Sequence, residues 1–302
     1  MTGIEIRTYA PDDADAVAAV RSAVTSTDGE SWMPGPDQRP GEPPSAALVA
    51  TVGETVVGYT HAISWDEHDG TSLYLILGWI HPDHRRRGYG DTLIAAQEEA
   101  VRWALKAQPA TGRPVFGANA ETPGGVAFVK RHGFAYVFSM VDQVMDLSTM
   151  PEPIAFPAGV EERPVTADHH RAIFDVIVEC FDDHAHGYVT ATWDEYREEC
   201  LDEDTGPWSV AWAGDEIAGL VISTVDGDGV ADTPWVAVRR PWRRRGLAQA
   251  MLRSSQCSLY ANGVRTAGIR TTLENENDTV GLYERLGYRV TSRHPRYRKP
   301  VS

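Results

Sequence analysis

The stretch IHPDHRRRGYG, at residues 80–90, decides how the fold of this sequence is interpreted, because it has a near copy later in the chain. The copy, VRRPWRRRGLA, stands at residues 238–248, and in both places an apolar segment runs into three arginines and a glycine. The two glycines, Gly88 and Gly246, are 158 residues apart. Such a repetition raises the expectation that the whole chain repeats.

Two further pairs of segments repeat at nearly the same spacing. The segment AFVKRHGF matches GLYERLGY, and their glycines, Gly133 and Gly287, are 154 residues apart. The segment IEIRTYAPDDADAVAAV near the start resembles VEERPVTADHHRAIFDV, which begins at Val160. Three matched landmarks at nearly one offset predict two copies of one domain, and the length of 302 residues suits two domains.

A proline-rich segment separates the predicted copies. The segment STMPEPIAFPAG, at residues 148–159, holds three prolines, which a continuous helix or a central strand does not tolerate. We therefore predict an N-terminal domain over residues 1–147, a linker over 148–158 and a C-terminal domain over 159–302. A second segment rich in proline and glycine, residues 25–45, is predicted to be a long loop, either disordered or a lid over a site.

Each copy has the same predicted order of elements: strand, helix, loop, three strands, helix, strand, helix and final strands. The apolar spacing changes to a period near 3.6 directly after each arginine triplet, which predicts that a helix begins there. Gly133 and Gly287 stand where a short helix needs a left-handed residue at its end. Gly78 and Pro234 interrupt the strands before the triplets, where they are expected to mark a bulge or a break in pairing. The fold class is therefore α/β, in the mixed (α+β) sense.

The arginine corner, which is residues 85–90 in the first copy and 243–248 in the second, is predicted to bind an anion. The first turn of a helix has backbone N–H groups without partners, and the helix dipole adds positive potential there. Gly88 and Gly246 leave the backbone open to a phosphate, and the arginines add charge. A single basic triplet is usually a solvated surface, but two in register argue against that interpretation. The corners contain neither the GK[ST] of a P-loop nor the Gly-x-Gly-x-x-Gly of a dinucleotide-binding turn. The expected ligand group is therefore a pyrophosphate that is bound by another type of turn.

The motif Arg-x-x-Gly-x-Gly/Ala after a strand, with LYERLGY near the end of a copy, resembles the GNAT superfamily of N-acetyltransferases. The resemblance implies two tandem GNAT-type domains, each a mixed and mostly antiparallel sheet flanked by helices and split open beside its fourth strand. It also implies acetyl-CoA as co-substrate, with its pyrophosphate on the corner. The tandem arrangement is loosely similar to two-domain GNAT proteins that include mycothiol synthase. The coenzyme-binding residues expected on this basis are Val236, Val238, Arg243, Arg244, Arg245, Gly246, Leu247, Ala248, Asn275 and Asn277 in the second copy, and Ile80, Arg85, Arg86, Arg87, Gly88, Tyr89 and Gly90 in the first.

Tyr283 stands where the GNAT pattern places the tyrosine that serves the leaving sulfur. A phenol with a pKa near 10 is a weaker acid than a thiol near 8.5, so we expect a strong hydrogen bond to the sulfur rather than full proton transfer. The aligned residue in the first copy, Val129, can donate nothing, which predicts that the C-terminal domain is catalytic. The alternative role for Tyr283 is packing of its ring on the sheet. The family often has an asparagine where Glu276 stands, so whether Asn275 or Asn277 contacts the pantetheine is left open.

A general base is expected near the acceptor amine. Asp232, in the strand before the second corner, is the first candidate, and Asp226 and Asp228 in the preceding turn are weaker ones. His184 and His186 lie in a segment where GNAT proteins build the wall of the acceptor site, and they are expected either to contact the substrate or to be surface histidines.

Composition narrows the classes of function. The net charge of −15 argues against a nucleic-acid or anionic-membrane binder. Three widely spaced cysteines, Cys180, Cys200 and Cys257, indicate a reducing compartment with neither a disulfide framework nor a metal site, so a cytoplasmic location is expected. No signal peptide and no apolar run long enough for a membrane span is recognised.

The sequence therefore predicts an acetyl-CoA-dependent N-acetyltransferase that acts on the primary amine of a small molecule. Action on a cysteinyl pseudodisaccharide, as in mycothiol synthesis, and a non-catalytic acyl-CoA-binding regulator are the alternatives. Expected partners are the amine substrate alone, without nucleic acid or membrane, and the chain is expected to be a monomer or a homodimer. No metal is expected.

Overall fold

The computed structural model describes residues 3–29, 32–37, 45–181, 192–201 and 203–302. Contacts divide the chain into unit 1, which is Met1–Val137 with Arg296–Ser302, and unit 2, which is Phe138–Pro295. The boundary predicted from the sequence repeat lies at residues 147–159. The three-dimensional contacts divide the chain differently: unit 1 ends at Val137, and the last seven residues of the chain also belong to unit 1. No described helix is long and apolar enough to cross a membrane.

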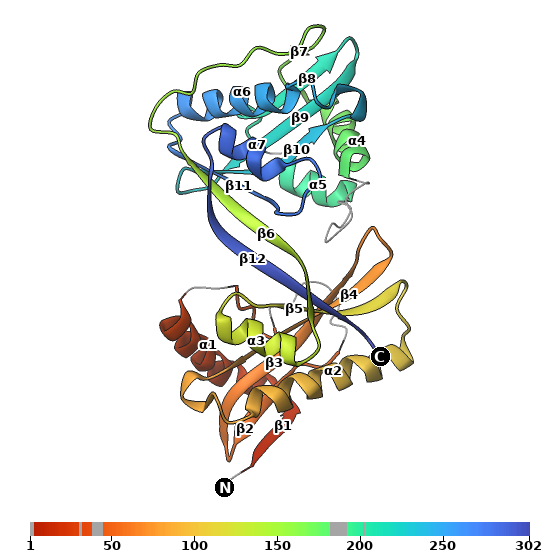
Figure 1. The fold of residues 1–302 in the computed structure, drawn as a ribbon, viewed down its shortest axis with the longest axis vertical. Coiled ribbons are helices and arrows are strands. Elements are labelled where there is room, and N and C mark those ends of the chain that lie inside the picture. The colour runs from red at the N-terminus through yellow and green to blue at the C-terminus, as the bar shows by residue number, and fades with distance from the viewer. Residues whose placement is uncertain (1–2, 30–31, 38–44, 182–191, 202) are drawn as a thin grey trace. The chain divides into compact units, whose positions relative to one another are not determined.

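Unit 1 holds the expected order of elements around one sheet (Figure 1). Its strand order is β1-β2-β3-β4-β5-β12, and neighbouring strands are antiparallel except β4 and β5. The elements are β1 (Ile4–Thr8), α1 (Ala14–Asp28), β2 (Leu48–Val52), β3 (Thr55–Asp66), β4 (Thr71–Ile80), α2 (Tyr89–Ala107), β5 (Arg113–Asn119) and α3 (Pro123–Arg131), with the later part of β12 (Arg289–Pro300).

Unit 2 repeats this order and adds one helix, α5, that the sequence did not predict. Its strand order is β12-β6-β11-β10-β9-β8-β7, in which β10 and β11 are parallel. The elements are β6 (Ala135–Asp146), β7 (Glu161–Glu162), α4 (His170–Phe181), α5 (Trp193–Cys200), β8 (Ser209–Ala213), β9 (Glu216–Val225), β10 (Val230–Val238), α6 (Leu247–Ala261), β11 (Thr266–Thr272), α7 (Thr279–Arg285) and the first part of β12. The expected fold class, mixed α/β with mostly antiparallel strands, is confirmed.

The closing strand of each repeat pairs in the sheet of the other repeat. Residues 296–300 of β12 pair with β5 of unit 1, and residues 140–146 of β6 pair with β11 of unit 2. Figure 1 shows the blue end of β12 running to the C-terminus beside β5. The two structural units therefore do not coincide with the two sequence repeats.

The last residues of the chain are firmly bound in unit 1. Tyr297 is 4% exposed within the core around Phe116. Arg298 pairs with Glu67 at 2.6 Å, and these side chains are 11% and 1% exposed. Lys299 pairs with Glu98 at 2.5 Å. A buried carboxylate is costly without its partner, so the tail stabilises unit 1.

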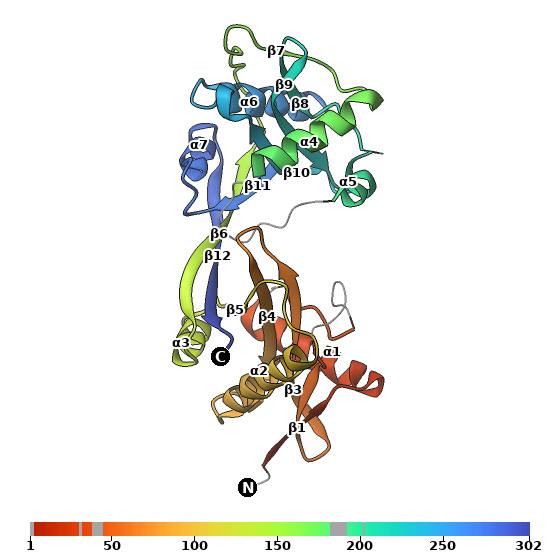
Figure 2. The same ribbon diagram turned by 90° about the vertical axis from the view of Figure 1, so that its right-hand side faces the viewer.

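Two helical layers cover the two faces of the unit 2 sheet (Figure 2). One core cluster lies beneath α6 and α7 and includes Leu247, Met251 and Tyr283. The other lies beneath α4 and α5 and includes Ile173 and Ile222. The buried positions of α6 recur every three or four residues, so its apolar stripe faces the sheet.

The sheet of each unit opens beside its fourth strand, as the resemblance implied. In unit 1, β4 pairs with β5 only from Thr71 to Leu75. In unit 2, β10 pairs with β11 only from Val230 to Thr233. Beyond these residues the edge of the fourth strand is free of pairing with the fifth, which creates a V-shaped split in the backbone pairing.

Pro234 lies at the predicted bulge, because the register of β10 against β9 shifts between Asp232 and Trp235. Gly78 pairs with Thr60 of β3 in regular register, so it marks no bulge. It lies beyond Leu75, however, where β4 no longer pairs with β5, so the expected break in pairing is found there. A Cβ on Gly78 would stand 3.1 Å from the Thr60 Oγ1, so glycine serves close packing there. The left-handed conformations expected of Gly133 and Gly287 are confirmed, at φ of 83° and 103°.

Candidate functional site

The arginine corner has the same backbone in both units. Gly246 precedes α6 with φ of 82°, and Gly88 precedes α2 with φ of 82°. Arg244 and Arg86 are also left-handed, each with φ of 62°. In each turn two residues with positive φ are separated by one residue without it. Turns of this kind can direct successive N–H groups toward one side, as in the anion-binding concavities found at helix starts. Both units therefore have the same turn at the start of a helix, which is the feature on which the prediction of an anion site depends.

The first arginine of each triplet ties the corner to the preceding strand. The Arg243 Nε donates to the Val238 carbonyl at 2.9 Å, and the Arg85 Nε donates to the Ile80 carbonyl at 3.1 Å. Arg85 also pairs with Asp28 at 2.7 Å. These two side chains thus hold the turn in shape.

The remaining arginines of the corners are exposed. Arg245 lies over the Trp242 ring at 4.8 Å, and Arg87 donates to the Asp83 carbonyl. Arg244 and Arg86 have no hydrogen bond or ion pair with any residue that the structure describes. Arg244 and Arg86 are therefore the corner arginines whose charge no described residue pairs with.

The other residues expected at the corners line the same turns. Leu247 is buried under α6 and anchors the helix start, whereas Ala248 is half-buried. Tyr89 is the first residue of α2. A Cβ on Gly90 would lie 3.2 Å from the Phe128 ring, so close packing against that ring favours glycine at this position. Val236 and Val238 are partly buried against the core cluster under α6. Ile80 is partly buried against the cluster that includes Val57 and Leu93 in unit 1.

Tyr283 lies on α7 and is 4% exposed. Its ring belongs to the core cluster that also contains Leu247, the first residue of α6, so the phenol and the corner share one packed body. Burial raises the pKa of Tyr283 above its ordinary value, which keeps the phenol protonated and able to donate. No described residue is a hydrogen-bond partner of its hydroxyl. In unit 1 the aligned Val129 is 5% exposed in an apolar core.

Asp232 is the last residue of β10 before the bulge, and it is exposed on the face that carries α4 and α5. A Cβ on Gly268 of β11 would lie 3.5 Å from its Oδ1, so the carboxylate faces the strand at the mouth of the split. Desolvation raises the pKa of Asp232; the Thr233 N–H and Arg270 lower it in part, and the charge of Asp142 raises it further. The corresponding part of β4 in unit 1 carries Leu73, Tyr74 and Leu75, so unit 1 lacks this carboxylate.

The remaining predicted site residues lie in turns or outside the described part of the chain. Asp226 accepts from the N–H groups of Asp228 and Val230, which closes the turn before β10. The Asn275 side chain accepts from the Asn277 N–H at 2.8 Å in the turn after β11. His184 and His186 lie outside the described residues.

A cluster that the sequence did not reveal lies beside Asp232. The Asp142 Oδ1 accepts from the Arg270 Nε at 2.5 Å, and its Oδ2 contacts the His294 Nε2 at 2.7 Å and the Ser292 hydroxyl at 2.8 Å. Desolvation alone would raise the pKa of Asp142, but these three hydrogen bonds hold it well below its ordinary value. The members come from β6, β11 and β12, which are far apart in the sequence, so no local motif could have indicated the cluster.

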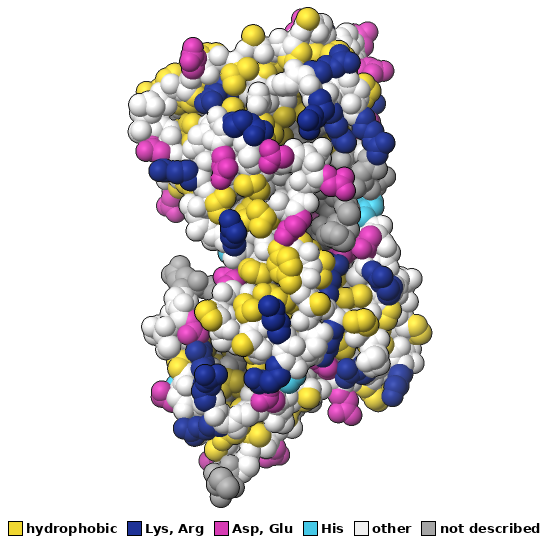
Figure 3. Space-filling view, in the orientation of Figure 1, with side chains coloured by type: hydrophobic (Ala, Val, Ile, Leu, Met, Phe, Trp, Pro, Cys, Tyr) yellow, Lys and Arg dark blue, Asp and Glu magenta, His cyan; other side chains and the backbone are white. Residues whose placement is uncertain are grey.

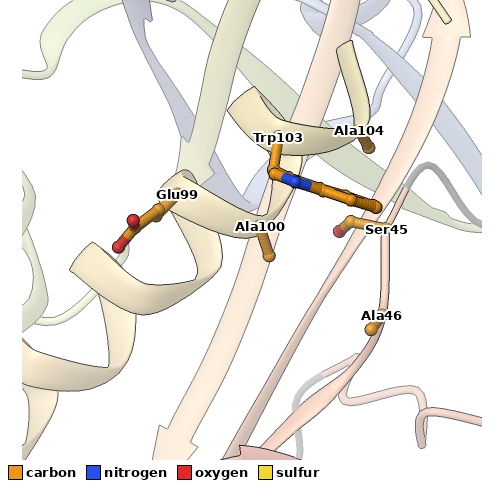
Figure 4. A pocket seen from close by; sticks show the side chains of 6 residues that line it. All are labelled: Ser45, Ala46, Glu99, Ala100, Trp103 and Ala104. Carbon is orange, nitrogen blue, oxygen red and sulfur yellow. The ribbon is translucent and has the colours of Figure 1, made fainter. Parts of the chain in front are cut away.

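Two pockets lie away from the arginine corners. Figure 4 shows a pocket of about 270 Å³ where the Trp103 ring of α2 lies toward Ser45 and Ala46. Another, of about 340 Å³, lies along β6, β11 and the start of β12 and includes Val144 and Thr266. Neither includes a residue of an arginine corner. The part of the chain that the structure describes holds no group of metal-ligating side chains. On the face drawn in Figure 3, basic and acidic side chains are interspersed.

Comparisons with known proteins agree with this geometry. The acetyltransferase (GNAT) domain model matches residues 43–136 and 204–290, which together make more than half of the chain. A mycothiol acetyltransferase of Actinosynnema mirum is 26% identical over 257 residues, which cover 83% of this chain and 82% of that protein. One of Streptomyces avermitilis is 25% identical over 297 residues, which cover 92% of this chain and 89% of that protein.

Solved structures share the fold over almost the whole chain. A GCN5-related N-acetyltransferase from Sphaerobacter thermophilus has a TM-score of 0.73 and 23% identity, with 99% of this chain and 96% of that chain covered. A tandem GNAT protein from the clavulanic acid biosynthesis pathway has a TM-score of 0.62 and 17% identity, with 99% of each chain covered.

Proposed function

This chain belongs to the acetyltransferase (GNAT) family and is an N-acetyltransferase, and we propose that unit 2 transfers the acetyl group of acetyl-CoA to the primary amine of a small molecule. The observation that carries this assignment is the shared core cluster of Tyr283 and the α6 corner. Unit 1 keeps the corner, but it has Val129 where unit 2 has Tyr283, and the part of β4 that corresponds to Asp232, Leu73 to Leu75, carries no carboxylate.

The corner at Arg243–Ala248 would hold the diphosphate against the N–H groups that start α6. The thioester would then extend into the split between β10 and β11, where backbone N–H groups of β10 beyond Thr233 are free of pairing with β11. Such N–H groups stabilise the oxyanion that develops on the thioester carbonyl. Asn275 or Asn277, at the end of β11, would contact the pantetheine.

The chemical step needs a base and a donor to the sulfur. Asp232 takes a proton from the acceptor ammonium, and the neutral nitrogen attacks the carbonyl carbon. The new C–N bond forms as the C–S bond breaks, and the electron pair of that bond leaves on the thiolate. The nitrogen then loses its second proton to the thiolate, which gives the neutral amide and the free thiol of CoA. The Tyr283 phenol donates a hydrogen bond to the sulfur, which burial favours because it keeps the phenol neutral.

The similarity to mycothiol acetyltransferases favours a cysteinyl pseudodisaccharide as one acceptor to test first. Other aminosugars and polyamines are the competing acceptors. A non-catalytic acyl-CoA-binding regulator is the second candidate, favoured only by Val129 in unit 1. Partners other than the amine are not proposed, and the cytoplasmic location stays a prediction that cell fractionation would check.

Release of free thiol from acetyl-CoA, measured with a panel of amines, tests the proposal. We expect release with one class of amine, together with a product that has gained one acetyl group by mass spectrometry. If the protein binds acetyl-CoA but acetylates no amine of the panel, the regulator is the better assignment.

A further inference from the structure

The polar cluster around Asp142 lies on the open part of the unit 2 sheet, next to the proposed base. Asp232 and Gly268 are directly paired, and Arg270 is two residues beyond Gly268 on the same face of β11. Asp142 is directly opposite Arg270 on β6. Arg270 therefore stands between two carboxylates, and residues on diagonal positions of neighbouring strands are within reach of a long side chain.

In the structure Arg270 forms its side-chain hydrogen bond with Asp142. Its Nε donates to the Asp142 Oδ1 at 2.5 Å, whereas no hydrogen bond joins it to Asp232 within the described residues. The other oxygen of Asp142 is held by Ser292 and His294 of β12, which fixes the carboxylate so that Oδ1 faces β11. Arg270 therefore acts on Asp232 only through its charge, which lowers the pKa of Asp232 in part, and not through a hydrogen bond.

We propose that Asp142, a residue of the first repeat, is a positioning residue of the acetyl-transfer site, which ties Arg270 to β6 and so leaves Asp232 free to bind the acceptor ammonium and take its proton. The inference rests on the proposed function of Asp232. It also gives the exchange of closing strands a consequence for the reaction, because β6 brings Asp142 into unit 2.

The charged groups that face Asp232 are few. Arg270 comes from β11 and Asp142 from β6, with His294 of β12 behind it; Thr224, the paired residue on β9, carries no charge. The Tyr288 phenol, beneath the sheet, senses the charge of Asp232 but has a raised pKa because it is buried. Arg270 is thus the one described cation whose position decides how strongly Asp232 holds a proton.

The variant Asp142→Asn removes the charge that holds Arg270. Arg270 is then expected to pair with Asp232, and an ion pair of this kind lowers a carboxyl pKa by about 1 or more. Because the base acts when deprotonated, the acidic fall of kcat/KM for the amine should move to lower pH by roughly one pH unit. The KM for the amine should rise by up to about fivefold, since Arg270 competes with the ammonium for Asp232.

Two further variants separate positioning from structure. In Asp142→Asn with Arg270→Gln no cation is left to pair with Asp232, so the acidic fall should return toward its wild-type pH. Arg270→Gln alone, at a side chain 61% exposed, should move the fall to higher pH. Asp146→Asn is the matched control, because Asp146 is a carboxylate of the same strand that caps the Ser148 N–H instead. It should leave the profile unchanged.

The pKa of Asp232 can also be titrated without any acceptor, by carbon NMR of the aspartate-labelled protein with the signal assigned from Asp232→Asn. We expect a lower pKa in Asp142→Asn and a recovery in the double variant. An unchanged pKa in Asp142→Asn, or an equal shift in both variants, overturns the inference. Thiol release by the wild-type protein is measured separately, so failure of the proposed function is distinguished from failure of this inference.

Discussion

Arg86 and Arg244 adopt the same left-handed backbone conformation, with φ of 62° in each, although 158 residues separate them. A residue with a side chain costs about 1–2 kcal/mol in this conformation, so two such residues at equivalent positions indicate a turn whose shape is held by its surroundings. Those surroundings are the strand end that Arg85 or Arg243 grips and the helix that follows.

Gly246→Val is expected to weaken coenzyme binding by tenfold or more. No atom lies within 4 Å of the position of the new Cβ, so the loss comes from the φ of 82°, which a branched residue does not tolerate, and not from a clash. The KM for acetyl-CoA checks this. Gly88→Val introduces the same strain in unit 1, and turnover should persist; loss of turnover in that variant alone would place the reaction in unit 1.

Tyr283→Phe is expected to lower kcat by about 10² while the protein stays folded, because the ring remains in its core cluster and only the donor to the sulfur is lost. Since burial raises the pKa of Tyr283, its ionisation should not limit the rate near neutral pH. Tyr260→Phe, at a tyrosine of α6 whose ring lies beneath Arg265, is the control. Equal kcat in both variants would leave Tyr283 a packing residue.

Arg298→Met is expected to destabilise unit 1 by about 3–5 kcal/mol, because it leaves the Glu67 carboxylate buried and unpaired. Adding Glu67→Gln removes that charge and should recover much of the loss. Unfolding in denaturant measures both. Arg293→Met, on an exposed residue of the same strand, should change little, and an equal loss there would point to a general effect of charge.

His170 is expected to make stability depend on pH. Its Nδ1 contacts the Tyr196 hydroxyl at 2.9 Å, and burial, with the charge of His169, lowers its pKa below the ordinary value near 6.5. The unfolded chain then binds the proton more readily, so this contribution is present above about pH 6.5 and is lost as the pH falls toward the folded pKa. His170→Gln should flatten the fall of the unfolding free energy in this range, whereas His68→Gln, at an exposed histidine, should not.

The sequence alone determined the repeat, the order of elements and the two corners. These features depend on local chemistry: arginine and glycine at a strand-to-helix turn, apolar spacing that changes period, and a glycine after a short helix. Tyr283 and Val129 could be compared because one motif carries both. For the same reason Pro234 correctly marked a bulge, and Gly78 correctly marked the part of β4 that does not pair with β5.

Only the tertiary structure decided which strands complete each sheet. Backbone hydrogen bonding by the closing strands β6 and β12 does not distinguish the sheet of one repeat from that of the other. Their exchange is settled by long-range contacts, such as the Arg298 pair with Glu67 and the Asp142 pair with Arg270. A pair of charges more than a hundred residues apart leaves no periodic trace in a sequence, so the cluster beside Asp232 became visible only when the strands were side by side.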